Sequence, residues 1–189
     1  MTRILVTALI ALPALLPAQD CSKPFNSPLA PGQQLSIDAR SGDIEIAGTK
    51  AAALRVTCNL PDDPSRAKDV KISLAAGHLR ISGGPNKSVR IRIEVPEKTN
   101  LVVRSTAGDM SIKGITGDKD VELNAGNLTI QVGDPASYRV AEGSVMAGDL
   151  NAKVFGETKD GIFRSFRKEN AKGRYRLRAK LMAGLLQVL

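Results

Sequence analysis

The sequence predicts an all-β protein built as a stack of short strands, that is, a β-solenoid. Three observations support this fold class. Apolar residues alternate with polar ones in short runs, a glycine-containing phrase recurs between the runs, and only 3% of the 189 residues are aromatic. A narrow solenoid core needs few large aromatic side chains. A β-sandwich also has short strands and regular turns, so it remains the alternative fold.

The strands are marked by apolar residues at every second position, with almost no helical periodicity. The face that carries Val, Ile and Leu must be covered, because burying each such side chain contributes about 1.5–3 kcal/mol. In chain order the runs are Leu35 and Ile37; Ile44 and Ile46; Leu54, Val56, Cys58 and Leu60; Val70, Ile72 and Leu74; Leu79 and Ile81; Val89, Ile91, Ile93 and Val95; Val121 and Leu123; and Leu128, Ile130 and Val132.

The recurring phrase consists of a small residue, a glycine, usually a polar residue and then an aliphatic residue. Glycine supplies a positive φ at such turns, and Asp or Asn hydrogen-bonds to the nearby backbone. The glycines at 108, 126 and 148 are 18 and 22 residues apart, and the 36 residues from 148 to 184 are close to two such steps. The spacing predicts successive layers of a stack. The phrases are Ser41-Gly42-Asp43-Ile44, Ala76-Gly77-His78-Leu79, Ala107-Gly108-Asp109-Met110, Ala125-Gly126-Asn127-Leu128, Ala147-Gly148-Asp149-Leu150 and Ala183-Gly184-Leu185-Leu186.

Residues 1–18 have the pattern of a secretory signal peptide. Arg3 precedes an apolar stretch from Ile4 to Leu16, and Pro17-Ala18 ends it with a small residue. The stretch is too short to span a bilayer, and its prolines disfavour a buried helix. A lipoprotein signal is disfavoured because Asp20, rather than a small residue, precedes Cys21. We expect cleavage near Ala18 and a mature chain that starts at about Gln19.

The two cysteines are expected to pair, because exported thiols tend to form disulfides. Cys58 is in phase with Leu54, Val56 and Leu60, so it points to the apolar face. Cys21 lies in a Pro-rich leader, residues 19–33, which shows no periodicity of its own. A Cys21–Cys58 bond would fasten this leader to the body. The alternative is a buried thiol at Cys58 and a free one at Cys21.

The sequence lacks the residues that most catalytic and metal sites require. His78 is the only histidine, it occupies the turn position that Asp43 fills elsewhere, and no Gly-x-Ser-x-Gly or phosphate-binding loop occurs. Cys21, Cys58 and His78 lack the spacing of zinc ligands. Five Gly-Asp pairs suggest calcium, but the paired glycines of calcium-binding repeats are missing. We therefore expect no catalytic residue, no cofactor and no metal. The five aspartates are Asp43, Asp109, Asp118, Asp134 and Asp149.

A periplasmic enzyme that acts on polysaccharides is the alternative function. A solenoid groove can place two Asp side chains together, which glycoside hydrolysis requires. Grooves that bind sugars usually offer aromatic platforms, whereas this chain has six aromatic residues. Phe163 and Phe166 are interpreted as core or cap residues.

The positive charge is concentrated near the C-terminus, since residues 164–180 carry eight basic residues and one acidic residue. Arg174, Arg176, Arg178 and Lys180 alternate with Tyr175, Leu177, Ala179 and Leu181, so a strand here would display four cations on one face. These four are candidate contacts for an anionic envelope polymer. The other interpretation is a solvated face near the exposed end of the stack, where charges discourage edge-to-edge association.

The phrases SGDIEI, TAGDMSIKGITGD, NAGNLTI and MAGDLNAKV, after IRIEVPEKTNLVV, resemble the bacterial putative-adhesin family. The resemblance covers residues 34–189 and implies an exported, right-handed, β-helix-like stack of unknown function, without an agreed active site. The cysteines and the basic tail are not part of the family pattern.

Together these observations favour a non-catalytic, adhesin-like binding or scaffolding module, exported to the periplasm or the extracellular space. Its expected partners are an anionic envelope polymer or another envelope protein. A physiological nucleic-acid partner is not expected, and the mature chain has no transmembrane segment by sequence.

Overall fold

The computed structural model describes residues 18–85 and 89–189, so the predicted signal segment up to residue 17 lies outside the described residues. The described chain is almost entirely β-structure. Its elements are β1 (Gln19–Asp20), β2 (Phe25–Pro28), β3 (Gln34–Ser41), β4 (Asp43–Thr49), β5 (Ala53–Asn59), the 3-10 helix η1 (Pro64–Asp69), β6 (Val70–Ala75), β7 (His78–Gly83), β8 (Arg90–Pro96), β9 (Asn100–Ala107), β10 (Met110–Lys113), β11 (Lys119–Ile130), η2 (Pro135–Ser137), β12 (Tyr138–Ala152), η3 (Lys153–Phe155), β13 (Glu157–Lys159), β14 (Ile162–Glu169) and β15 (Tyr175–Val188). None of its helices is long and apolar enough to cross a membrane.

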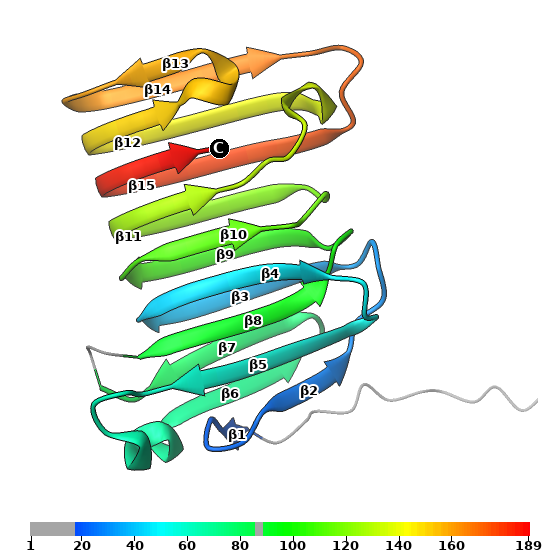
Figure 1. Ribbon diagram of the computed structural model, residues 1–189, viewed down its shortest axis with the longest axis vertical. Coiled ribbons are helices and arrows are strands. Elements are labelled where there is room, and N and C mark those ends of the chain that lie inside the picture. Colours follow the sequence, from blue (N-terminus) through cyan, green and yellow to red (C-terminus); the bar gives the residue numbers. More distant parts are fainter. Residues whose placement is uncertain (1–17, 86–88) are drawn as a thin grey trace, which may run out of the picture.

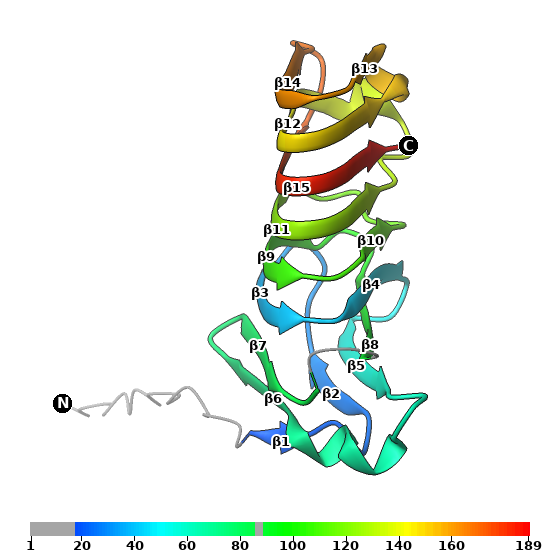
Figure 2. The ribbon, with the colours of Figure 1, turned by 90° about the vertical axis from the view of Figure 1, so that its left-hand side faces the viewer.

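The strands form a stack of bent layers, which confirms the predicted β-solenoid (Figures 1 and 2). The layers have two arms. Five layers bend at a glycine, with arm A before the bend and arm B after it, and the strands of the leader end together with β13 and β14 extend these two arms. Along the stack, arm A follows the order β1, β6, β7, β3, β9, β11, β15, β12 and β14. Arm B follows the order β2, β5, β8, β4, β10, β11, β15, β12 and β13. The long strands β11, β12 and β15 contribute to both arms.

The layers do not stack in the order of the sequence. The last strand, β15, lies between β11 and β12 and runs parallel to both, so Leu186 pairs with Leu128 on one side and with Leu150 on the other. After β12 the chain reverses direction, since β13 and β14 run antiparallel to it. It then returns through residues 170–174 to the position between β11 and β12, which β15 fills. The interpretation of residues 148 to 184 as two successive steps was therefore wrong.

Five of the six predicted glycine phrases form one column at the bend. Gly42, Gly108, Gly126, Gly184 and Gly148 lie on top of one another in this spatial order, with φ between +116° and +132°. The Gly108 amide donates to the Ala125 carbonyl at 3.0 Å. A methyl group on any of the last four glycines would overlap the carbonyl oxygen of a neighbouring glycine. Glycine is therefore required here both for its φ and for the close approach of the backbones.

The sixth phrase, Ala76-Gly77-His78-Leu79, has a different role, which corrects the prediction. Ala76 and Gly77 have φ of +48° and +76°, and Ala75 pairs with His78 across an antiparallel hairpin. Two residues with positive φ connect strands tightly because this turn matches their twist. The phrase thus joins β6 to β7 within one arm and does not contribute to the glycine column.

The alternating apolar residues fill the space between the two arms, as their periodicity predicts. Leu35, Ile37, Ile46 and Leu123 are fully buried in a single core. Phe166 is also buried and stacks on Phe155, with ring centres 5.7 Å apart, so it closes the end of the core. Phe163 is 76% exposed, so its interpretation as a core or cap residue was wrong.

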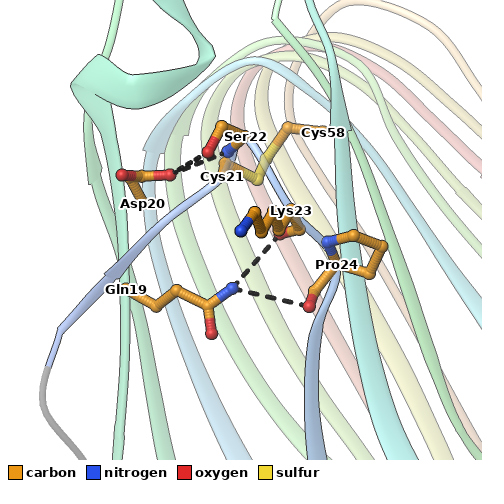
Figure 3. The surroundings of a disulfide bond; sticks show 7 residues. All are labelled: Gln19, Asp20, Cys21, Ser22, Lys23, Pro24 and Cys58. Carbon is orange, nitrogen blue, oxygen red and sulfur yellow. Dashed lines mark hydrogen bonds between the residues drawn. A yellow bond between two sulfur atoms is a disulfide. The ribbon is translucent and has the colours of Figure 1, made fainter.

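The leader is joined to the opposite end of the stack by strands and by a disulfide. β1 pairs with β6, and β2 pairs with β5, both antiparallel. Phe25, Ser27 and Leu29 are buried, so buried and exposed side chains alternate in the leader. The expectation that the leader has no periodicity was wrong. The expected bond between Cys21 and Cys58 is present, with Cα atoms 5.7 Å apart (Figure 3). The leader is thus part of the folded body.

Candidate functional site

The basic strand β15 presents its two faces as predicted, but at a different place in the stack. Leu177, Ala179 and Leu181 are buried, while Arg176 and Arg178 are exposed on the outer face of arm A. Because β15 is flanked by β11 and β12, the cations lie in the interior of a broad sheet face. The alternative interpretation, a solvated face near the exposed end of the stack, therefore had the wrong position for β15.

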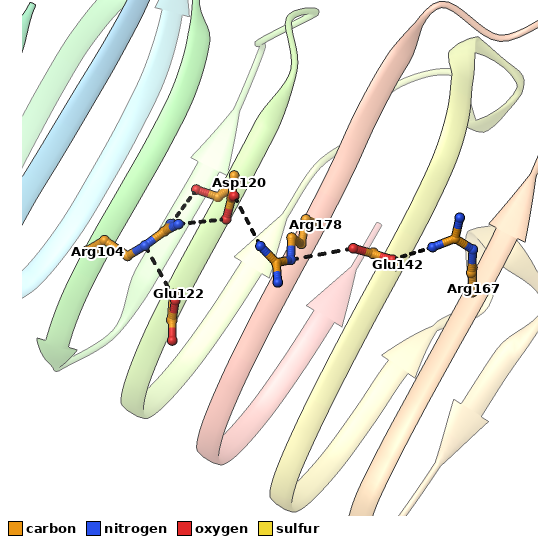
Figure 4. A network of polar contacts seen from close by, with 6 residues as sticks. All are labelled: Arg104, Asp120, Glu122, Glu142, Arg167 and Arg178. Carbon is orange, nitrogen blue, oxygen red and sulfur yellow. Dashed lines mark hydrogen bonds and ion pairs between the residues drawn. The ribbon is translucent and has the colours of Figure 1, made fainter.

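Carboxylates from neighbouring strands neutralise the centre of this face (Figure 4). Arg178 lies 3.6 Å from Asp120 of β11 and 3.5 Å from Glu142 of β12. Arg104 of β9 pairs with Asp120 at 3.0 Å, and Arg167 of β14 pairs with Glu142 at 2.8 Å. The network therefore crosses five strands. Each pair is partly exposed and contributes about 0–1 kcal/mol, so the main effect is that Arg178 already has its counter-ions.

The remaining predicted contacts differ in their surroundings. Lys180 is half-buried and makes no ion pair among the described residues. The Arg174 guanidinium lies 5.7 Å from the centre of the Tyr175 ring, and the backbone amide of Arg176 donates to Asp118 at 2.9 Å. Of the four predicted residues, Arg174 and Arg176 thus have exposed side chains that form no ion pair in the described part of the chain.

Lys172 extends this pair into a small cluster at the margin of arm A. Its side chain is exposed, and no ion pair involves it in the described structure. Arg139 lies beside the same turn, because the Asn170 amide donates to the Arg139 carbonyl at 2.9 Å. We call Lys172, Arg174 and Arg176 the edge cluster. Arg174 and Arg176 belong to the predicted basic face, whereas Lys172 was not among its predicted residues.

Three of the five aspartates of the Gly-Asp pairs, Asp109, Asp118 and Asp134, accept hydrogen bonds from backbone amides. Asp134 accepts from the Ala136 amide at 2.9 Å, and Asp109 accepts from the side-chain and backbone nitrogens of Asn127 at 2.9 and 3.1 Å. Asp43 and Asp109 line one hollow of about 590 Å³ on arm B. The described residues contain no group of three or more metal-ligating side chains placed to hold an ion.

Two glutamates have shifted pKa values, and both shifts are downward. The Lys113 ammonium, with help from Arg92, holds the pKa of Glu45 below its usual value, and Lys168 and Lys159 do the same for Glu157. A general acid in glycoside hydrolysis needs a raised pKa. Neither glutamate is therefore suited to act as a general acid.

His78 is a surface residue next to the β6–β7 turn. Its Nε2 lies 2.7 Å from Asp38 of β3, and both side chains are about half exposed. An exposed pair of this kind links neighbouring strands and contributes little to stability. This position agrees with the interpretation of His78 as a turn residue.

Lys119 has no feature in the sequence that marks it as a functional residue, yet it is buried in the core at the first position of β11. Its side chain is 1% exposed, and its ammonium donates to the Gly117 carbonyl at 3.0 Å and to the Tyr138 hydroxyl at 2.7 Å. Burial lowers the pKa of Lys119 from 10.5 to about 8. This corresponds to a cost of about 3 kcal/mol for the charged form in the folded protein at neutral pH.

Replacing Lys119 with methionine is expected to remove a pH dependence of stability. Between pH 8 and 10 the unfolded wild-type chain binds more protons at this lysine than the folded one, so its free energy of unfolding should rise by about 2 kcal/mol. Burial raises the pKa of Tyr138, which acts in the opposite direction above pH 10. Urea unfolding of both proteins at several pH values measures the effect. If the free energy of unfolding had the same pH dependence in both proteins, the prediction would be contradicted. Tyr138→Phe serves as the control that keeps the lysine.

Comparison with known proteins adds a family match. The model of the family described as Toastrack DUF4097 matches residues 30–184. The chain is also similar to the crystal structure of a putative cell adhesion protein from Clostridium sporogenes, at 14% identity over 88% of this chain and 97% of that one, with a TM-score of 0.49. A putative adhesin from Bacteroides fragilis is similar at 9% identity over 88% and 96%, with a TM-score of 0.29. No curated protein matches the chain.

Proposed function

Since the chain belongs to the Toastrack DUF4097 family, we propose that it is an exported, non-catalytic module of the cell envelope that binds or scaffolds its partners. Residues 1–18 act as the export signal in this proposal, and residues 34–189 form the binding domain behind the leader. The apolar stretch from Ile4 to Leu16 and the disulfide support export, since disulfides persist in oxidising compartments.

The proposed partner is an anionic polymer of the envelope, bound at the edge cluster. The observation that carries this proposal is the contrast in ion pairing between Arg178 and the residues that lead into β15. Arg178 has carboxylates on both sides, whereas the side chains of Lys172, Arg174 and Arg176 are exposed and form no ion pair in the described structure. Asp118 accepts from the backbone amide of Arg176. Phosphate or carboxylate groups of a polymer would supply these missing counter-ions, and the neutralised face beside the cluster would not repel the polymer.

The triple variant K172Q/R174Q/R176Q is expected to lose most of the affinity for anionic polymer. Each cation near an anionic surface contributes about 1 kcal/mol, so binding to alginate or polyphosphate at low salt should weaken roughly 100-fold. Binding by the wild-type protein should also weaken steeply as salt is added, because exposed charges are screened. Isothermal titration calorimetry measures both effects.

The matched control removes the same charge elsewhere. Lys23, Lys50 and Arg55 are exposed and lie near the leader end of the stack, so K23Q/K50Q/R55Q has the same net charge as the triple variant. The control should retain the affinity. An equal loss in both variants would show that only the net charge matters, and unchanged binding in the edge-cluster variant would contradict the proposal.

A further inference from the structure

An exposed apolar patch lies at one corner of arm A, away from the edge cluster. Phe163 of β14, Met146 of β12 and Met182 of β15 occupy neighbouring positions in adjacent strands, with exposures of 76%, 44% and 46%. Ile162 precedes Phe163 and is 64% exposed. We call these four residues the corner patch. They are four of the six large hydrophobic residues that are exposed in the described part of the chain.

The backbone holds Phe163 at the tip of this corner. Its φ of +54° places it in the left-handed region, which is costly for a residue with a side chain. Phe163 follows the turn at residues 160–161 between β13 and β14, at the end of the stack opposite to the leader (Figures 1 and 2). An aromatic side chain is thus kept outward, in a strained conformation, at an extremity of the molecule.

The charges around the corner patch are positive. Met146, Phe163 and Met182 line a hollow of about 390 Å³ together with Arg164 and Lys180. Glu122 is the acidic residue among the described residues that line it, and it already pairs with Arg104 at 3.4 Å. Lys180 lies opposite Glu122 in the register of β11 and β15, and Arg164 donates to the Asp160 carbonyl at 2.6 Å. Neither cation makes an ion pair among the described residues, so the patch combines apolar side chains with two cations on β14 and β15.

We propose that the corner patch docks on an anionic phospholipid surface, with Ile162 and Phe163 entering the boundary between headgroups and acyl chains. A peripheral membrane contact needs only a few apolar side chains flanked by cations. A stable protein–protein interface needs about 20–30 residues on each side, far more than this corner offers. Arg164 and Lys180 would bind lipid phosphates while the apolar side chains leave water.

The sequence allows a direct test, because it contains no tryptophan. Phe163→Trp in the mature chain gives a single fluorescent reporter at the proposed depth. Vesicles of phosphatidylcholine and phosphatidylglycerol should shift its emission to the blue, and lipids brominated on the acyl chains should quench it. Vesicles of phosphatidylcholine alone should cause at most a small shift. Removing the apolar neighbours with I162S/M146S/M182S should lower the partition coefficient at least tenfold.

The controls separate this proposal from the polymer contact. Lys50→Trp places the reporter in an exposed turn near the leader end, and its emission should not change with either vesicle. The blue shift should persist in F163W combined with K172Q/R174Q/R176Q, although binding becomes weaker. The proposal fails if F163W co-sediments with anionic vesicles without a shift, which would indicate binding by charge alone. It also fails if the shift depends on protein concentration without lipid, which would indicate a second copy at the patch.

Discussion

Replacing Gly126 with alanine is expected to lower the free energy of unfolding by about 4 kcal/mol or to prevent folding. The added methyl group would overlap the Gly108 carbonyl oxygen, and its φ of +130° is one that L-residues rarely adopt. A strained φ costs about 1–3 kcal/mol, and overpacking adds a similar amount. Gly126 lies in the middle of the glycine column, so the overlap with Gly108 could be removed only if the layers on one side of Gly126 moved away. Urea unfolding followed by far-UV circular dichroism measures the loss.

Gly133 provides the matched control for this prediction. It also has a positive φ, +69°, but a methyl group there would meet nothing within 4 Å. Gly133→Ala should therefore cost only about 1 kcal/mol, which is the backbone penalty alone. If both variants lost the same amount, the backbone conformation would explain the effect and the close approach of the layers would not.

Removing the disulfide with C21S/C58S is expected to cost about 4 kcal/mol. The bond joins residues that are 37 positions apart, and the chain-entropy model assigns this value to a loop of that length. The two leader strands are short, with two and four residues, so they depend on the bond to stay in place. Amide hydrogen exchange should accelerate first in Phe25–Pro28.

Reduction of the wild-type protein provides the control for the disulfide. A reductant should lower the unfolding midpoint of the wild type to that of C21S/C58S and should leave the variant unchanged. If C21S/C58S had the same unfolding midpoint as the oxidised wild-type protein, β1 and β2 would be held by their strand pairing alone.

The strands and the core were predictable from sequence because burial on one face imposes a period of two on every run. Leu35, Ile37 and Ile46 follow this rule and are fully buried. The glycine column was predictable for a similar reason, since the backbone conformation at Gly108 and Gly126 excludes other residues.

The order of the layers could not be derived in this way. The bends of β11, β12 and β15 have nearly the same local sequence. The local sequence therefore does not determine which of these strands pair with each other. The assignment of Ala76-Gly77 failed for a related reason, because a hairpin turn and a bend both favour a small residue followed by glycine. At the candidate site, the alternation of β15 predicted which residues are exposed. The neutralisation of Arg178 depends on Asp120 and Glu142, which are distant in sequence.

The position of β15 between β11 and β12 constrains the order in which the layers can form. The strands β11 and β12 precede β15 in the chain, so until β15 docks between them both keep open parallel edges of the same register. Such edges are templates for other chains. The β15 strand of a second molecule carries the same residues and would fit the gap in the same register, which is the geometry of strand exchange. A partly folded chain is therefore open to strand exchange until its own β15 fills this gap.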